Sequence, residues 1–519
     1  MLPLINARES RAFERSFDPW LSENLLMEHA GFGAARVLEH EVGAALAQTL
    51  ILGGVGNNGG DAWVLARALR CRGLEPRVWL CGEPGRIRGP AAQALGALKA
   101  LGCVPSVLSE DAFPRFLDDV RAAKAAVDGC LGVGVSRPVT GLLAEAIRAL
   151  NAASAPTLAL DVPSGVCAST GQVLGCAVVA ACTATFAAHK PGLLAEPGRA
   201  LAGRVVVVGL GVPAPALGSS RVLERRDHGT WLPPRAATAH KRSVGHVAVV
   251  GGGAGTEGAA VLAARGAMRA GAGLVTWLRP LPSKWPGLCL ESGSAGGAAE
   301  EVAGDARPQA GSLAPSWLAT LPEVMTTAFS MDTLASGRWD ALVLGPGFGR
   351  DSAAFSTLST IALTWPGPAV LDADALAALA QSGLDGLRAC AGPRVLTPHE
   401  GEAARLLGCT AAEVASDRFS AVRSLSQRAG QVVVLKGPGS LVACPEGRIA
   451  ACPYGSAVLA SGGTGDVLAG MLSALLAQDA SPFTAACAAV LWHALASERF
   501  GADRGVLASD LADALPLVK

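Results

Sequence analysis

One pattern recurs along this chain: a short apolar run, a glycine-rich turn and an Ala/Leu-rich segment of helical character. The two fullest examples, each in the order strand, loop and helix, are residues 49–52, 53–61 and 62–69, and residues 246–250, 251–258 and 259–270. Further apolar runs lie at 157–160, 205–208, 341–344, 369–371 and 432–435. Uninterrupted apolar strands that alternate with helices are typical of parallel sheets covered on both faces. We therefore predict an α/β fold whose ligands bind beyond the carboxyl ends of the strands.

The length of the chain indicates more than one domain. Single hydrophobic cores stop growing near about 250–300 residues, and this chain has 519. The stretch 212–239 is rich in Pro, Gly, Ser and Arg and has no clear periodicity, so we predict a boundary near residue 225 and domains of residues 1–225 and 226–519. A second irregular stretch, 280–315, is predicted to be a surface insertion within the second domain.

The composition argues against partners that are recognised mainly by charge. Lysine plus arginine and aspartate plus glutamate number 43 each, so the net charge is zero and we expect neither a nucleic-acid partner nor a membrane partner. The 13 cysteines are scattered, without a C-x-x-C pair or zinc spacing, which favours a reducing cytoplasm. Arg8, Glu9 and Arg11 stand where a secretory signal would have its apolar core, and no run of about 18 apolar residues indicates a membrane span.

The segment 461–466, Ser-Gly-Gly-Thr-Gly-Asp, leads directly into the apolar helical run 467–472. The first turn of such a helix offers unpaired backbone N–H groups and the positive end of its dipole to an anion. A carboxylate at this place, Asp466, suits a base that takes a proton from a hydroxyl group attacking a phosphoryl group. Asp466 is alternatively a helix cap, but a cap does not require the flanking glycines, so we favour the phosphate interpretation. The spacing is not that of a P-loop.

Three polar loops in the first half each follow a predicted strand. The segment 57–61, Asn-Asn-Gly-Gly-Asp, has hairpin-turn residues, but it lies between an apolar strand and a helix, which favours a ligand-binding loop. Asp128 precedes the glycine-rich loop 129–138, although Asp-Gly is also ordinary turn chemistry. Asp161 ends a strand and precedes a turn fixed by Pro163. Because the carboxyl ends of parallel strands share one edge of the sheet, we expect these loops to converge.

In this order, the three loops resemble the motifs of the NAD(P)H-hydrate epimerase family, and residues 26–31 resemble its opening helix. That family interconverts the R and S forms of hydrated nicotinamide dinucleotides, and the resemblance implies a Rossmann-like three-layer α/β/α domain. It implies that the hydrate is bound by Asn57, Asn58, Gly59, Gly60, Asp61, Gly132, Val133, Gly134, Val135, Ser136, Arg137, Pro138 and Asp161. Asp161 is also implied to be catalytic. The resemblance further implies a K⁺ ion at Asn58, Asp128 and Ser164, whose hard oxygen donors suit an alkali cation. Ala62 and Val133 replace the family's usual Gly and Thr.

The second half has four further polar segments after predicted strands. The segment 345–349, Gly-Pro-Gly-Phe-Gly, is predicted to be a turn or a ligand loop. Asp372 and Asp374 place two acids at a strand end, where water-mediated Mg²⁺ binding and capping of the next helix are equally compatible. The segment 397–402, Thr-Pro-His-Glu-Gly-Glu, holds a histidine between a fixed turn and a helix start, which favours a site. The segment 434–440 combines a lysine, a glycine loop and a hydroxyl group, which suits nucleotide phosphate.

Together with residues 251–260, these segments resemble the ADP-dependent NAD(P)H-hydrate dehydratase family, whose fold is ribokinase-like. The Gly-Gly-Thr-Gly-Asp motif is shared with many small-molecule kinases, whereas the histidine motif makes the resemblance more specific. It implies hydrate contacts from Ala260, Gly349, His399 and Asp466, with Asp466 catalytic, and nucleotide contacts from Lys436, Gly437, Pro438, Gly439, Ser440 and Gly465. Ser440 stands where the family usually has Thr, and residues 452–459 depart from its Asn/Gly-rich pattern.

The two resemblances together imply a bifunctional repair enzyme. One half equilibrates the epimers; the other phosphorylates the ring hydroxyl of the S form with ADP and Mg²⁺ and then loses phosphate, which restores NADH or NADPH and leaves AMP. Hydrated NADH, hydrated NADPH and ADP are the expected partners, and we expect a homo-oligomer. One alternative is a hydroxyethylthiazole-type kinase with an accessory domain, which leaves His399 without a role. Another is a non-catalytic binding module in the first half, against which the joint presence of Asn58, Asp128, Asp161 and Ser164 argues.

Overall fold

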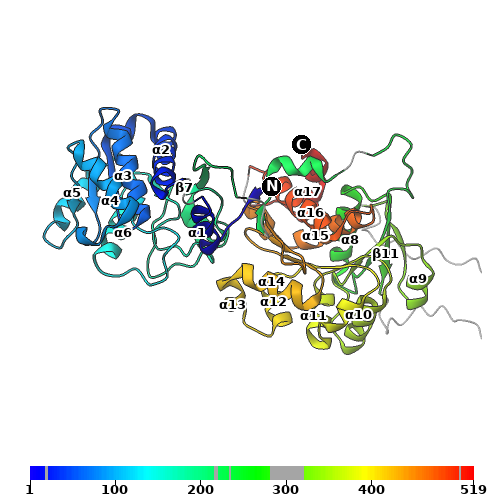
Figure 1. Cartoon of the computed structure of the whole chain (residues 1–519). Helices are drawn as coiled ribbons and strands as arrows, with labels where there is room; N and C mark the ends of the chain where they lie inside the picture. Colours follow the sequence, from blue (N-terminus) through cyan, green and yellow to red (C-terminus); the bar gives the residue numbers. More distant parts are fainter. Residues whose placement is uncertain (18–20, 216–219, 233–234, 281–320, 502–503, 519) are drawn as a thin grey trace, which may run out of the picture. The chain divides into compact units, whose positions relative to one another are not determined.

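The structure is a computed structural model that describes the chain except residues 18–20, 216–219, 233–234, 281–320, 502–503 and 519 (Figure 1). The insertion predicted at 280–315 therefore lies almost wholly outside the described residues. The chain forms two compact units. The first unit comprises Met1–Asp227, Leu407–Gln427 and Leu435–Pro453, and the second comprises His228–Leu406, Arg428–Val434 and Tyr454–Lys519.

The first unit is built on a seven-stranded parallel sheet. Its strands, in spatial order, are β4 (Ser106–Val107), β3 (Arg77–Leu80), β2 (Thr49–Gly53), β5 (Ala125–Gly129), β6 (Thr157–Leu160), β7 (Cys182–Phe186) and β8 (Arg204–Val208). Every residue of β2, β5, β6 and β7 is buried. Such strands need apolar partners on both faces, so their composition already required helices on each side.

Two hydrophobic clusters show how the helices cover this sheet. The helices are α1 (Ala7–Arg15), α2 (Glu23–Val42), α3 (Asn57–Arg70), α4 (Gly89–Ala100), α5 (Phe113–Ala122), α6 (Gly141–Ala152) and α7 (Gly198–Ala202). Ile51 of β2 packs in one cluster with α2, α3 and α4, whereas Leu50 and Leu52 pack in the other with α5 and α6. Because successive side chains of a strand point to opposite faces, the sheet lies between two helical layers, and the predicted α/β fold is confirmed for this unit.

The helix after β2 begins earlier than the sequence pattern predicted. It starts at Asn57 after an N-cap at Gly56, so the polar motif 57–61 forms its first turn, and the prediction of a loop as far as residue 61 is wrong. A Cβ on Gly59 would lie 1.9 Å from the backbone oxygen of Gly54. Two glycines in the first turn lower helix propensity, but the missing side chain lets the helix start pack directly on the strand end, and that packing decides its conformation.

The second unit contains a parallel sheet of its own. Its strands, in spatial order, are β16 (Val432–Leu435), β15 (Arg394–Leu396), β14 (Ala369–Leu371), β13 (Ala341–Leu344), β10 (His246–Val250), β11 (Leu274–Arg279) and β12 (Met325–Ala328). Within the first unit, β1 (Leu2–Pro3), β9 (Ser220–Val222), β18 (Ile449–Ala451) and β17 (Leu441–Ala443) are hydrogen-bonded in this order.

Helices lie on both sides of the second sheet, as Figure 1 shows for α8 and α15 on one side and α10 and α11 on the other. The helices are α8 (Glu257–Arg269), α9 (Met331–Ser336), α10 (Ser352–Thr364), α11 (Asp374–Ser382), α12 (Glu400–Leu407), α15 (Thr464–Leu476), α16 (Pro482–Ser497) and α17 (Ala508–Ala514), while α13 (Ala411–Ser416) and most of α14 (Arg418–Ala429) belong to the first unit. Helices α8 and α15 pack closely, because a Cβ on Gly470 would lie 1.9 Å from the oxygen of Ala263. Nearer the start of α15, where Asp466 lies, a Cβ on Gly266 of α8 would lie 2.3 Å from the Val467 oxygen.

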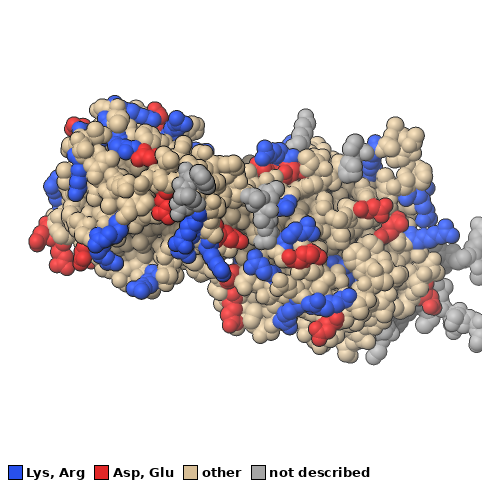
Figure 2. All heavy atoms as spheres, viewed as in Figure 1, with Lys and Arg blue, Asp and Glu red and all other residues tan. Residues whose placement is uncertain are grey.

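The surface carries charges of both signs. On the face shown in Figure 2, basic and acidic side chains are interspersed over the described residues. Within those residues, no helix has the length and hydropathy needed to cross a membrane.

Candidate active sites

A cavity of about 480 Å³ lies at the carboxyl edge of the first sheet. Its walls come from the segments that directly follow β2, β5 and β6, as expected for a parallel α/β sheet. Of the residues predicted to bind the hydrate, it is lined by Asn57, Asn58, Asp61, Gly132, Val133, Gly134, Val135 and Asp161. Gly59, Gly60, Ser136, Arg137 and Pro138 are not among the lining residues. Gly60 instead lies against Met27, since a Cβ there would be 2.5 Å from the Met27 sulfur.

Asp161 forms a buried ion pair that the sequence reading missed. The ammonium group of Lys190 lies 2.6 Å from Asp161 Oδ1, and the lysine side chain is completely buried. Lys190 Nζ also donates to Thr185 Oγ1 at 3.0 Å and to the Phe186 oxygen at 2.7 Å. A signal was present in the sequence, because a lysine and a Pro-Gly turn follow the apolar run 182–186 at the sheet edge that holds the other polar loops.

Three further carboxyl groups, those of Asp61, Glu14 and Glu23, line the same cavity, together with Arg11. Burial raises the pKa of Asp61 well above its ordinary value, and the nearby charge of Asp161 raises it further. Burial also raises the pKa of Glu14, against a hydrogen bond from Ser10 at 3.1 Å. The cavity therefore combines one ion-paired carboxylate with two carboxyl groups that the surroundings favour in the neutral form. Glu14 lies on α1 and carried no recognisable motif in the sequence.

Of the three oxygen donors predicted for K⁺, Asn58 lines this cavity, whereas Asp128 and Ser164 do not; they accept hydrogen bonds from the N–H groups of Cys130 and Leu131, which line it. Asp128 is fully buried on β5 and accepts from the Ser164 backbone N–H at 2.7 Å and from the Ser164 hydroxyl at 2.6 Å. Burial raises the pKa of Asp128, while the hydrogen bonds from Ser164 lower it. Asn58 donates through its amide nitrogen to the Leu160 oxygen at 3.1 Å. Its amide oxygen Oδ1 is buried and has no hydrogen-bond partner among the described residues.

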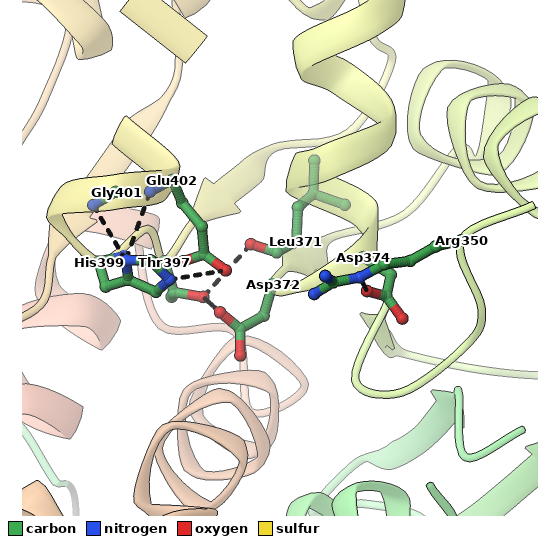
Figure 3. A network of polar contacts seen from close by, with 8 residues as sticks. All are labelled: Arg350, Leu371, Asp372, Asp374, Thr397, His399, Gly401 and Glu402. Atoms are coloured by element: carbon green, nitrogen blue, oxygen red, sulfur yellow. Dashed lines mark hydrogen bonds and ion pairs between the residues drawn. The ribbon is translucent and has the colours of Figure 1, made fainter. Parts of the chain in front are cut away.

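In the second unit, two acids follow β14 and have different surroundings (Figure 3). Asp372 is buried and accepts a hydrogen bond from the Thr397 hydroxyl at 2.8 Å. Asp374 accepts from Arg350 Nε at 2.7 Å and from the Gly349 N–H at 3.1 Å, so it fixes the loop that carries Gly349. Ala373 occupies the N-cap position of α11, so neither acid is the N-cap residue, and Asp374 lies in the first turn of the helix.

His399 is held against the start of α12 by its own neighbours (Figure 3). Its Nδ1 accepts from the Gly401 N–H at 3.0 Å, and its backbone N–H donates to Glu402 Oε2 at 2.8 Å. The side chain is 54% exposed, with Nε2 3.6 Å from Glu402 Oε1. Because Nδ1 is an acceptor, the neutral ring carries its proton on Nε2, which can donate to a bound ligand.

Asp466 lies in the first turn of α15 and is half-buried. Gly463, in the left-handed conformation at φ 91°, is the N-cap of this helix, so the cap position does not fall to Asp466. The Thr464 hydroxyl donates to the oxygens of Ser461 and Leu459, each at 3.0 Å, and so closes the glycine loop. Ala260 is buried on the adjacent helix α8. Gly465 lies between Thr464 and Asp466 at the helix start, where N–H groups lack intrahelical acceptors.

The loop predicted to bind nucleotide, Lys436–Ser440, belongs to the first unit and is organised by Arg418. The buried guanidinium of Arg418 donates to the Pro438 oxygen at 2.5 Å, the Gly439 oxygen at 2.9 Å and the Lys436 oxygen at 3.1 Å. Ser440 Oγ donates to the Gly437 oxygen at 3.0 Å. Sequence reading missed Arg418, which lies in α14 well before the loop, and no motif marks it.

Comparison with known proteins agrees with the two-site arrangement. Residues 23–192 match the family model described as YjeF-related protein N-terminus, and residues 295–517 match that of NAD(P)H-hydrate dehydratase. The bifunctional NAD(P)H-hydrate repair enzyme Nnr of Moorella thermoacetica is 35% identical over 99% of this chain and 96% of that protein. The protein of the same name from Coxiella burnetii is 37% identical over 98% of each chain.

A solved structure, the ADP/ATP-dependent NAD(P)H-hydrate dehydratase of Bacillus subtilis co-crystallised with ATP/Mg²⁺, is 26% identical, covers 57% of this chain and 97% of that protein, and has a TM-score of 0.47. The family assignment rests on the relatives that match over nearly the whole chain, and the hydroxyethylthiazole-type kinase alternative is not favoured. The chain belongs to the bifunctional NAD(P)H-hydrate repair enzymes, which join an epimerase to a dehydratase.

Proposed function

We propose that the cavity of the first unit is the epimerase site and that Asp161 transfers protons there. Inversion at the ring carbon that bears the hydroxyl group requires this group to leave as water and a water molecule to return on the other face. A proton is added to the departing oxygen and one is removed from the incoming water, so none is consumed. The position of Asp161 on the cavity wall, among residues of the segments 57–61 and 132–138, supports this role. We propose that these segments contact the hydrate.

We further propose that Asn58, Asp128 and Ser164 hold K⁺. An unpaired buried amide oxygen costs about 1–3 kcal/mol, and a cation beside Asn58 Oδ1 would remove this cost. Amide, carboxylate and hydroxyl oxygens are donors that a hard cation prefers. When bound, the ion supplies a fixed positive charge beside the cavity. Asn58 and Asp128 keep their orientation through the bonds to Leu160 and Ser164.

For the dehydratase we propose that Asp466 takes the proton from the ring hydroxyl of the S form as this hydroxyl attacks the terminal phosphoryl group of ADP. The products of that step are the phosphorylated ring and AMP; loss of phosphate with a proton from the neighbouring carbon then restores the dihydronicotinamide. The N–H groups at the start of α15 support this assignment, because they can stabilise charge on the transferred group. Mg²⁺ would neutralise phosphate charge during the transfer.

The remaining predicted contacts belong to the same proposal. Ala260, Gly349 and His399 are proposed to contact the hydrate, and Lys436, Gly437, Pro438, Gly439, Ser440 and Gly465 the nucleotide. The hydrogen bonds that fix Gly349 through Asp374 and orient His399 support the first set. The bonds from Arg418 to the loop oxygens support the second.

One observation carries the proposal of two separate chemistries: Asp161 and Asp466 lie in different units of the chain. We expect the full-length protein with ADP and Mg²⁺ to restore the dihydronicotinamide absorbance of a mixture of both hydrated epimers completely. With Asp161→Asn, the recovery of absorbance should stop when the S form is consumed, apart from slow spontaneous interconversion of the epimers. Asp466→Asn should interconvert separated epimers but restore no absorbance. An Asp466→Asn variant with near-normal dehydration would show that the base lies elsewhere, and an unchanged epimerisation rate in Asp161→Asn would reject its role.

The domain limits 1–225 and 226–519, a homo-oligomeric state and a cytoplasmic location complete the proposal. The unpaired state of the cysteines that the structure describes agrees with a reducing compartment. Expression of each half by itself tests the limits, light scattering after gel filtration tests the oligomer, and cell fractionation tests the location. Each half should retain only its own activity.

A further inference from the structure

Lys190 is a buried cation to which none of the motifs assigns a role. Its side chain is completely buried, and its three short contacts go to Asp161, Thr185 and Phe186. Burying an ammonium group costs several kcal/mol unless a negative charge and acceptors compensate for the lost water. Asp161 Oδ1, at 2.6 Å, supplies that negative charge. The buried ammonium group of Lys190 therefore requires an ionised Asp161 beside it, and the ionised Asp161 in turn requires the lysine.

The conformation of Asp161 leaves its second oxygen for the cavity. Its backbone is left-handed, with φ 64°, and its N–H donates to the Ala184 oxygen at 2.8 Å, so the residue is held at both the backbone and Oδ1. A Cβ on Gly132 would lie 3.4 Å from Asp161 Oδ2, and Gly132 lines the cavity. A strained residue that is fixed by its surroundings is common where a side chain must point in one direction. One carboxylate oxygen is occupied by Lys190, and the other is next to the glycine-lined wall.

The other charged groups around the cavity make this cation necessary. Glu14 on α1 and Asp61 on α3 face the same space as Asp161, and each raises the energy of a negative charge there. Glu23 and Arg11 line this cavity as well, so the four carboxyl groups outnumber the cation in its wall and would not all ionise without further compensation. Lys190 contacts only one of them, Asp161. The ion pair thus compensates the charge of Asp161 directly.

We propose that Lys190 is a positioning residue of the epimerase: it holds Asp161 as a carboxylate with Oδ2 turned to the cavity, and it touches no substrate itself. This inference rests on the proposed epimerase function. It predicts that Lys190 matters only through Asp161. A lysine that merely supported the fold would contribute the same factor whether or not Asp161 is present.

A double-mutant cycle tests this with the full-length protein and a single purified epimer of hydrated NADH. Interconversion is followed by chromatography without ADP, so that dehydration does not proceed. Lys190→Met should lower kcat by about 100-fold with little change in KM, since the substrate does not contact the lysine. In the Asp161→Asn background the same change should alter the rate by less than about threefold.

Controls separate this role from a loss of folding. Lys190→Gln keeps a donor for Phe186 but carries no charge, so it should lose epimerisation as Lys190→Met does. Thr183→Val is a matched variant on β7, the strand that precedes Lys190: it removes the buried bond from Thr183 Oγ1 to the Ala202 oxygen, at 2.7 Å, and should epimerise normally. Near-ultraviolet circular dichroism and urea unfolding of each variant, compared with the unaltered protein, report whether the first unit has folded, because Lys190 and Asp161 belong to that unit.

The possible outcomes are distinct. Equal losses in the wild-type and Asp161→Asn backgrounds would overturn the inference while the epimerase function stands. An active Lys190→Gln variant would overturn it as well. Absence of interconversion by the unaltered protein would overturn the proposed function and this inference together.

Discussion

Replacing Arg418 by methionine is expected to weaken ADP binding while leaving epimerisation intact. The guanidinium group donates to three carbonyl oxygens of the loop Lys436–Ser440, at 2.5, 2.9 and 3.1 Å, and is almost completely buried. Methionine fills a similar volume with an apolar chain and offers no donor. The loop oxygens then need hydrogen bonds from water instead. Because Gly437 and Pro438 are already exposed, the loop can move outward to form them.

The magnitude follows from two opposing costs. Each hydrogen bond from a charged donor contributes about 1.5–3 kcal/mol, but outward movement of the loop recovers part of this in water, so we expect a stability loss of about 2 kcal/mol. A loop released in the free protein must be ordered again when ADP binds. Fixing a residue's backbone costs about 1–2 kcal/mol, and two such residues give about 2–4 kcal/mol, which corresponds to an about 30- to 900-fold higher KM for ADP.

Arg394→Met is the matched control, because it removes an equally buried guanidinium from another place in the chain. Arg394 donates to the oxygens of Ala362 at 2.7 Å, Gly367 at 2.7 Å and Gly392 at 2.9 Å. It should therefore lose stability at least as strongly but keep the KM for ADP within about threefold. Dehydration of the S form is measured against ADP concentration at a temperature where both variants are folded. An unchanged KM in Arg418→Met, or an equal rise in both variants, would refute this reasoning.

Three further predictions address the first unit. Gly59→Ala should lower the free energy of unfolding in urea by about 1–3 kcal/mol and slow epimerisation, because its Cβ would lie 1.9 Å from the Gly54 oxygen. The control Gly96→Ala, with open space around its Cβ, should stabilise α4, and equal effects of the two substitutions would contradict this account. Asp61→Asn should raise the free energy of unfolding at about pH 8 but not at about pH 3. Burial raises the pKa of Asp61 in the folded state, so the unaltered protein loses stability as the pH rises above the pKa that Asp61 has in the unfolded chain. A variant without this gain at high pH would show that Asp61 is not desolvated. Asn58→Leu should abolish any stimulation of epimerisation by KCl relative to NaCl, with dehydration of the S form unchanged; a stimulation that persists would place the ion elsewhere.

Local sequence patterns were sufficient to predict those elements whose own residues determine their conformation. The runs 49–52, 157–160 and 246–250 have no polar face, so they could only be central strands of a covered sheet, and all three are buried strands. Asp128 and Ser164 follow or end such strands, and parallel pairing brings β5 and β6 together, so their contact at 2.6 Å was within reach of the sequence. The start of α3 could not be predicted from the sequence, because its glycines disfavour a helix locally and only the contact with Gly54 stabilises it.

The sequence by itself determined the fold class and which strand ends carry polar groups, because hydrophobic periodicity and turn residues act over a few neighbouring positions. Tertiary structure decided the contacts that neighbouring strand ends do not bring about. Lys190, which follows β7, reaches Asp161 at the end of the neighbouring strand β6, Glu14 comes from a separate helix, and Arg418 supports a loop that follows it by about twenty residues. Charge pairing and burial depend on distance in space and on exclusion of water, and neither is encoded at a single position of the chain.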